Sequence, residues 1–334
     1  MWLRALRCWL KRRVEAGVGW TGIGMAVSVA LVAAALAILF VMVRDVGIGT
    51  VIAATMAMPP RAVLAACCLT GAGYLTLTFY DYFALRALGR QDVPYVTAGL
   101  AGFAAYAIGH GLGLTVLTGN AVRLRIYSRW GLGVVDVAKI SFITGLSFWL
   151  GNILALGLVL VVAPGTAAAV THLPVWANQS LGLVAFTVIA AYVVWLLPRS
   201  RAVGTASWRV VLPDARLTVC LLGIGILDLT AGSLATYVLL PATPPTGYAV
   251  IAVAYVIAAL LGFISHAPGS LGVFEAAMLV MLSHYQKEEL LASLLILHVL
   301  YYVLPLAVAL MMFGLLETRL LSTSPAPSRR SAFS

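Results

Sequence analysis

The stretch FISHAPGSLGVFEAAML (residues 263–279) interrupts one of the longest apolar segments of this chain. It places a histidine, a proline and two glycines between hydrophobic flanks, and Glu275 follows three residues after the second glycine. Such a break is costly where lipid surrounds the backbone, because unpaired peptide groups and carboxylates find no water there. The role of this break therefore depends on whether lipid or water surrounds the chain.

The composition identifies that solvent as lipid. Of 334 residues, 62% are hydrophobic and only 10% are charged, whereas a soluble domain carries about 25% charged residues. The net charge of +10 comes from basic residues in short loops, where they indicate topology and contact anionic lipids rather than nucleic acid. The four cysteines show no paired spacing, so we expect no disulfide framework, metal site or cofactor.

Apolar segments long enough to cross a bilayer define the fold class. A hydrocarbon core of about 30 Å requires about 20 apolar residues per helix. Six segments meet this requirement: 20–43, 62–85, 138–163, 179–198, 217–240 and 290–313. Two more, 94–119 and 248–284, are interrupted by GHGLG (109–113) and SHAPGSLG (265–272). We predict an all-α integral membrane protein with six spans and two broken re-entrant segments.

Loop charge predicts the orientation. A basic N-terminus at 1–19 is expected in the cytoplasm. If 94–119 dips into the membrane and returns, turning at 109–113, then Arg123, Arg125 and Arg129 stay on the cytoplasmic side. The membrane domain then covers 20–313, with inverted halves at 20–163 and 179–313, and a disordered cytoplasmic tail follows at 314–334. The breaks share a fragment, IGHGLG against ISHAPG, in which Ile-x-His-x-x-Gly recurs.

Residues at the breaks are the first functional candidates. Irregular backbone inside a membrane is tolerated where it lines a cavity, so we expect a polar cavity beside His110, Ser265 and His266. A half-helix that begins near Leu271 would direct its N–H groups at this cavity. Glu275, in its first turn, either caps the half-helix or meets a ligand.

Two aspartates lie in corresponding spans of the two halves. Asp81 is near the cytoplasmic end of its helix, where it either has an interfacial role with Arg86 or lines a site. Asp228 is in the middle of its span, so we expect it to face a cavity or a cationic partner.

The basic stretch NAVRLRIYSRW (120–130) combines arginines with aromatic residues. Asn120 and Arg123 share a helical face, as do Arg125 and Arg129. Arginine grips phosphate with two donors, so this stretch either holds a lipid phosphate or only anchors the protein by the positive-inside rule.

The histidines within apolar segments, which include His298, are expected to be hydrogen-bonded rather than metal ligands, because no ligand-spaced pair occurs. Proton coupling through His266 and Glu275 is an alternative. No catalytic constellation is visible, so we expect that the chain is not an enzyme.

Several motifs occur in the order known for one family: YDYFALRALGR (80–90), GHGLGLTVLTGNAVRLRIYSRWGL (109–132), SFWLG (147–151), LDLTAGSLATYVLLP (227–241), ISHAPGSLGVFE (264–275) and LYYVLPL (300–306). Residues 20–313 resemble the transmembrane flippase region of bacterial lysylphosphatidylglycerol synthases, the multiple peptide resistance factor family. The resemblance implies flipping of aminoacylated phosphatidylglycerol to the outer leaflet of the inner membrane, which confers resistance to cationic peptides. It assigns site roles to Asp81, Arg123, Arg125, Tyr127, Asp228, Pro268, Gly269, Gly272 and Glu275. Asn120, Ser270 and His298 depart from the family pattern.

The soluble synthase domain of the full-length family members has no counterpart, so we expect this chain to translocate a phospholipid without synthesising it. Expected partners are membrane phospholipids and a separate aminoacyl-lipid synthase or other lipid- or glycan-modifying enzyme; a homodimer stays open. Both termini are expected in the cytoplasm. The alternative function is a non-transporting membrane partner of such an enzyme.

Overall fold

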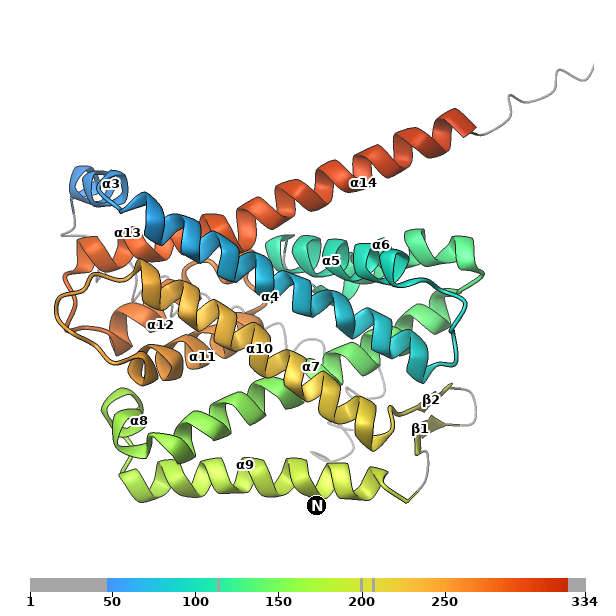
Figure 1. Cartoon of the computed structure of the whole chain (residues 1–334), viewed down its shortest axis with the longest axis horizontal. Coiled ribbons are helices and arrows are strands. Elements are labelled where there is room, and N and C mark those ends of the chain that lie inside the picture. Colours follow the sequence, from blue (N-terminus) through green and yellow to red (C-terminus); the bar gives the residue numbers. More distant parts are fainter. Residues whose placement is uncertain (1–46, 113–114, 199–200, 206–207, 324–334) are drawn as a thin grey trace, which may run out of the picture.

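A computed structural model describes residues 47–112, 115–198, 201–205 and 208–323 of the chain, and it is helical almost throughout (Figure 1). The predicted first span at 20–43 and the basic N-terminus lie outside the described residues, as does the end of the tail. Within the described part, six helices have the length and composition of membrane spans. They are α4 (Pro60–Ala87), α7 (Val134–Val162), α9 (Val175–Leu196), α10 (Ala215–Leu239), α11 (Tyr248–Ser265) and the continuous helical stretch Lys287–Leu315. The all-α membrane fold is therefore confirmed.

Five of these helices coincide with predicted spans, and α11 is the first arm of the second broken segment. The last span is composite and consists of α13 (Lys287–His298), the π-helical turn η3 (Val299–Val303) and α14 (Leu304–Thr323). The short elements outside the spans and the broken segments are α3 (Ile48–Met56), η1 (Ser128–Trp130), α8 (Pro164–Thr171), β1 (Ala202–Thr205) and β2 (Trp208–Val211). The antiparallel β1–β2 hairpin lies between α9 and α10.

Both broken segments form helical hairpins. α5 (Tyr95–Leu112) packs against α6 (Thr115–Tyr127), and α11 packs against α12 (Val273–Met281) across the short helix η2 (Pro268–Ser270). Each hairpin returns to the end of the molecule at which it starts, and the two start at opposite ends (Figure 1). η2 contacts α5, so the breaks meet inside the bundle.

The position of the first break differs from the prediction. α5 continues through GHGLG to Leu112, so the chain does not turn within 109–112. Gly111 serves packing instead, because a Cβ added to it would lie 2.9 Å from a methyl carbon of Leu306 on α14. A glycine in an apolar helix thus marks a close helix contact as readily as a turn.

The second spans of the two predicted halves, α4 and α10, pack side by side and run in opposite directions (Figure 1). Small residues make this approach possible: a Cβ on Gly73 of α4 would lie 3.1 Å from Oδ1 of Asp228. Gly151 of α7 and Gly225 of α10 likewise bring two backbones together, since an added Cβ on either would lie 3.0 Å or less from the other's Cα. Antiparallel counterparts agree with inverted halves, which stay a prediction.

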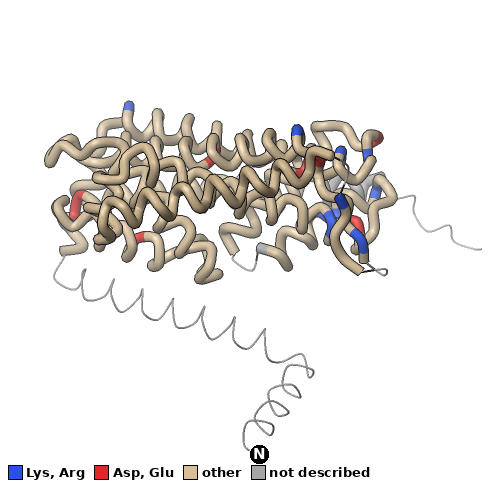
Figure 2. Tube along the Cα trace, turned by 90° about the horizontal axis from the view of Figure 1, so that it is seen from below, with Lys and Arg blue, Asp and Glu red and all other residues tan. Residues whose placement is uncertain are grey.

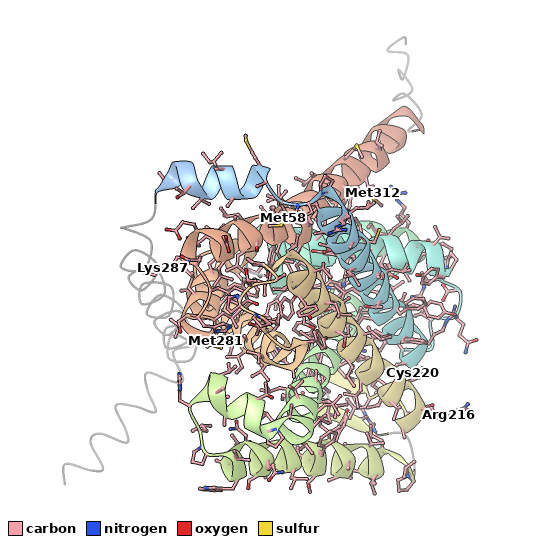
Figure 3. All side chains as sticks on the ribbon, turned by 60° about the vertical axis from the view of Figure 1, so that its left-hand side comes forward. Met58, Arg216, Cys220, Met281, Lys287 and Met312 are labelled. Atoms are coloured by element: carbon pink, nitrogen blue, oxygen red, sulfur yellow. The ribbon has the colours of Figure 1, made fainter. Side chains whose placement is uncertain are left out.

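Most of the lysine and arginine residues in the described part lie at one end of the molecule (Figure 2). This end holds the 86–93 loop, the end of α6, the β-hairpin and the start of α10 (Figure 1). Figure 3 shows Arg216, at the start of α10, and Lys287, at the start of α13, projecting on opposite sides of the bundle. The positive-inside rule places the basic end in the cytoplasm, and the orientation stays a prediction.

Candidate functional site

A buried ion pair joins the first hairpin to the bundle. On α6, Arg123 donates from Nη2 to Oδ1 of Asp81 at 2.7 Å and from Nε to Oδ2 at 2.9 Å. Tyr127 donates its hydroxyl hydrogen to the same Oδ2 at 2.8 Å. All three side chains are buried. Two-pronged pairing in the correct plane is the geometry that makes such a pair favourable away from water.

This pairing decides which arginine is the partner of Asp81. The predicted Asp81–Arg86 pairing is wrong, since Arg86 donates to the carbonyl of Gln91 at 2.8 Å. Asp81 pairs instead with Arg123 on α6, because the α5–α6 hairpin brings α6 back alongside α4.

Asn120 and Arg123 do share a face, and both approach Ser141 of α7. Asn120 accepts a hydrogen bond from the Ser141 hydroxyl, and Nη1 of Arg123 lies 3.5 Å from that oxygen. Arg125 lies elsewhere: it lines a different, smaller pocket together with Arg129. The two candidate arginines, Arg123 and Arg125, therefore do not act on one phosphate.

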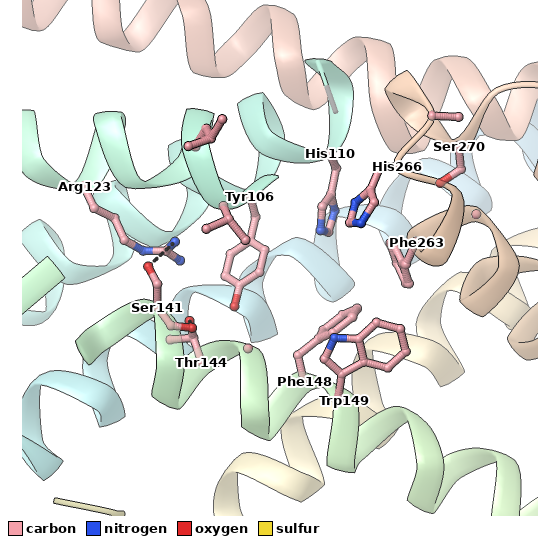
Figure 4. A pocket seen from close by; sticks show the side chains of 15 residues that line it. Tyr106, His110, Arg123, Ser141, Thr144, Phe148, Trp149, Phe263, His266 and Ser270 are labelled. Carbon is pink, nitrogen blue, oxygen red and sulfur yellow. Dashed lines mark hydrogen bonds between the residues drawn. The ribbon is translucent and has the colours of Figure 1, made fainter. Parts of the chain in front are cut away.

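A cavity of about 270 Å³ lies where the two hairpins meet, bounded by α5, α6, α7, α11 and η2 (Figure 4). His110 from α5 and His266 from the second break both reach it, close together in the view. The polar side chains that line it are Tyr106, His110, Arg123, Ser141, Thr144, His266 and Ser270. The predicted cavity beside the breaks is present and unites residues 156 positions apart in the sequence (110 and 266).

The second break is built so that its own polar groups are satisfied. Ser265 donates to the carbonyl of Gly262 at 2.7 Å and accepts from the amide of Ala267 at 3.2 Å. The amide of Ser270 donates to the carbonyl of Ala267 at 2.9 Å. Internal pairing of this kind is what a non-helical segment at membrane depth requires.

Four residues of this break have left-handed backbone conformations: His266, Gly269, Ser270 and Gly272, with φ between 54° and 81°. For histidine and serine this conformation is uncommon. The surrounding packing must therefore hold the break in place, and Pro268 begins η2 where no amide hydrogen is needed.

Glu275 is a helix cap and a hydrogen-bond partner of His298. Oε2 accepts a hydrogen bond from the Gly272 amide at 2.7 Å, and Oε1 lies 3.0 Å from Nδ1 of His298. Gly269 is close to the same imidazole, because an added Cβ would lie 3.1 Å from Nε2 of His298. Glu275 does not line the described cavity, and both its oxygens are engaged, so of the two roles left open for it the structure shows the cap and not the ligand contact.

Asp228 has no cationic partner among the described residues; the hydroxyl of Tyr301 donates to its Oδ1 at 3.4 Å. Tyr301 lies in η3, the π-helical turn. Pro305, four residues later, has no amide hydrogen for the Tyr301 carbonyl. That carbonyl accepts instead from the hydroxyl of Tyr74 at 2.9 Å. A proline-induced defect thus ties α4, α10 and the last span together next to Asp228.

We expect Tyr74→Phe to destabilise the protein by about 1–2 kcal/mol, because it removes the buried hydrogen bond that the Tyr301 carbonyl accepts from Tyr74. The loss is measured as the change in unfolding free energy in mixed micelles. Tyr82→Phe is the control, since Tyr82 is a half-buried tyrosine of the same helix. An equal change in both variants would contradict this role of Tyr74.

Sequence reasoning missed the α7 side of the cavity, namely Ser141, Thr144, Phe148 and Trp149. Hydroxyl and aromatic side chains such as these are common in membrane spans, so the sequence does not single them out. Only the folded structure shows that they lie close to the two breaks. Pro305 was the signal that could have located η3. No three His, Cys, Asp or Glu side chains gather as a metal site in the described part of the chain.

Comparison with known proteins places the chain among bacterial relatives. It is 31% identical over 245 residues to the uncharacterized protein slr0712 of Synechocystis, which covers 73% of this chain and 76% of that protein. The chain belongs to the family of slr0712. It is also 28% identical over 272 residues to the inner membrane protein YbhN of Escherichia coli, covering 77% of this chain and 81% of YbhN. No family model matches the chain, and neither relative's name states an activity.

Proposed function

We propose that this member of the slr0712 family translocates phospholipids across the bacterial inner membrane. The inner-membrane location of YbhN and the six apolar helices support the location. The resemblance to the flippase region of lysylphosphatidylglycerol synthases supports the reaction, with aminoacylated phosphatidylglycerol or a related lipid as cargo. The observation that carries the proposal is the cavity between two helical hairpins that enter the bundle from opposite ends.

The mouth of the cavity suits a lipid. Val116 and Leu117 at the start of α6 line it and are each 68% exposed in the described molecule, and Trp149 of α7, which also lines it, is 39% exposed. Apolar side chains exposed at mid-height of a membrane bundle face acyl chains. A headgroup can therefore enter the cavity sideways while its tails stay in the bilayer.

Each hairpin is fastened to the bundle by one buried polar contact. The Arg123–Asp81 ion pair joins α6 to α4, and the His298–Glu275 hydrogen bond joins α13 to α12. Transporters with broken helices open to alternate sides by moving such elements about a central site. These two contacts are the ones that such a movement would rearrange.

A cavity-filling substitution tests the proposal. Gly145 of α7 lines the cavity, and a Cβ added to it meets no atom within 4 Å. Gly145→Phe therefore fills the cavity at little cost to packing. In proteoliposomes with fluorescent phospholipids, we expect the dithionite-accessible probe to appear at least about tenfold more slowly than with the unaltered chain.

Gly223→Phe on α10 is the matched control, because its added Cβ also meets no atom within 4 Å and it lines none of the described cavities. It should leave translocation unchanged. If Gly145→Phe folds and translocates normally, the cavity is not the pathway. If the unaltered chain moves no phospholipid, the alternative of a non-transporting partner for a lipid- or glycan-modifying enzyme takes its place.

A further inference from the structure

The charge of the side chains that line the central cavity restricts the headgroup. Arg123 is the one lysine or arginine among the lining residues, and two histidines accompany it. The described lining contains no aspartate or glutamate. Hydroxyl groups of Ser141, Thr144 and Ser270 complete its polar surface.

Two buried carboxylates, Asp81 and Glu275, are already engaged by protein groups. Oδ1 and Oδ2 of Asp81 both accept from Arg123, and Oδ2 also accepts from Tyr127. Both oxygens of Glu275 are engaged by Gly272 and His298. An ammonium group brought into the cavity would lose its water without gaining a carboxylate, which is unfavourable in a low-dielectric site.

Two nitrogen-bearing side chains around the cavity have hydrogen-bonding capacity to spare. Nδ1 of His110 is buried without a hydrogen-bond partner, although buried imidazole nitrogens are normally paired. Nη1 of Arg123 has only the long 3.5 Å approach to Ser141. His266 lines the same cavity (Figure 4). The guanidinium and the two imidazoles can supply N–H donors that a phosphate oxygen would satisfy.

We propose that the cavity binds the phosphodiester headgroup of an anionic phospholipid and selects against a cationic aminoacyl headgroup. This inference rests on the proposed translocation of phospholipids; of the cargo named there, it keeps a related anionic phospholipid and rejects the aminoacylated lipid. A volume of about 270 Å³ is at the low end for ligand sites, so it holds a headgroup and leaves the acyl chains outside the exposed apolar mouth. The aromatic side chains Phe148, Trp149 and Phe263 offer an ammonium only cation–π contacts, which are weaker than ion pairing with a carboxylate.

Binding is measured separately from transport. Short-chain phosphatidylglycerol, its lysyl ester and water-soluble glycerol phosphate are titrated against the purified full chain in detergent micelles, with tryptophan emission as the signal. Trp149→Phe identifies the part of the signal that comes from the cavity. We expect phosphatidylglycerol to bind about tenfold more tightly than its lysyl ester, and glycerol phosphate to bind far more weakly than either lipid.

A double variant tests the donors. His110→Phe with His266→Asn removes both imidazoles while it keeps an aromatic ring on α5 and a residue that tolerates left-handed backbone at the break. It should lose most of the preference for phosphatidylglycerol. His172→Asn is the matched control, because His172 also ends a helix with φ near 57° and lies outside the cavity.

Equal or tighter binding of the lysyl ester overturns the inference while it leaves translocation intact. Tight binding of glycerol phosphate would identify a soluble phosphate ester instead of a lipid and would also overturn it. Preferential binding of phosphatidylglycerol without transport upholds the inference and refutes the proposed function. If the double variant does not fold, the comparison of the two lipids on the unaltered chain decides.

Discussion

Asp81→Asn is expected to lower the free energy of unfolding by about 3–5 kcal/mol, the largest effect that we predict for a single residue. The substitution keeps the size of the side chain but removes its charge. Arg123 is then left buried in the bundle without the carboxylate that receives its Nε and Nη2 hydrogens. The loss is measured by titrating the protein out of mild detergent with dodecyl sulfate and following helix content.

Two comparisons isolate the buried charge as the cause. Asp81→Asn with Arg123→Gln removes both charges, and it should recover at least half of the loss because no uncompensated charge stays buried. Asp92→Asn breaks a pair of the same two-pronged geometry, Arg90–Asp92, on the exposed 86–93 loop. The hydrogen bonds from Arg90 lower the pKa of Asp92, but water screens this pair, so the variant should be far less destabilised.

A small effect of Asp81→Asn would show that Arg123 reaches water or lipid phosphate once its partner is lost. In that case the ion pair would not be what holds α6 against α4, and its part in fastening the first hairpin would have to be withdrawn.

Gly232→Ala is the second large prediction, with an expected loss of about 3 kcal/mol, in the upper part of the range for overpacked cores. A Cβ on Gly232 of α10 would lie 2.0 Å from the hydroxyl oxygen of Tyr255 and 2.5 Å from its Cζ. Tyr255 on α11 is buried and packs edge-to-face on Phe274 of α12, with ring centroids 5.6 Å apart. The ring cannot retreat without displacing the second hairpin.

Rescue by a second substitution makes this prediction specific. Tyr255→Phe removes the oxygen that lies closest to the added methyl group, so Gly232→Ala with Tyr255→Phe should be more stable than Gly232→Ala alone. Gly223→Ala, at a position of α10 where a Cβ meets nothing, should be neutral or slightly stabilising because alanine favours helix. The same micelle titration measures all of these variants, and a neutral Gly232→Ala would show that α10 and α11 are not in fixed contact.

The sequence by itself determined the solvent of this protein, the positions of its described long spans and the place of the second break. Hydrophobic runs of about 20 residues locate spans because lipid tolerates little else, and a cluster such as SHAPGS ends a helix for reasons local to its backbone. Loop charge alone led to the expectation that 94–119 returns to its starting side, and the α5–α6 hairpin has this form. Glu275 as a cap was also readable, because Gly272 precedes it by three residues.

Only the tertiary structure decided which polar groups meet. Asp81 pairs with Arg123 rather than with the nearer Arg86 because the hairpin folds α6 back along α4, a choice that no local pattern encodes. GHGLG looked like a turn, but Gly111 is a contact surface for Leu306. Contacts between helices depend on rotation about their axes, and in an apolar helix that is hydrophobic on every side the sequence carries almost no signal of rotation. The cavity is assembled from five elements, so its lining depends on how those elements are rotated and not on any local sequence pattern.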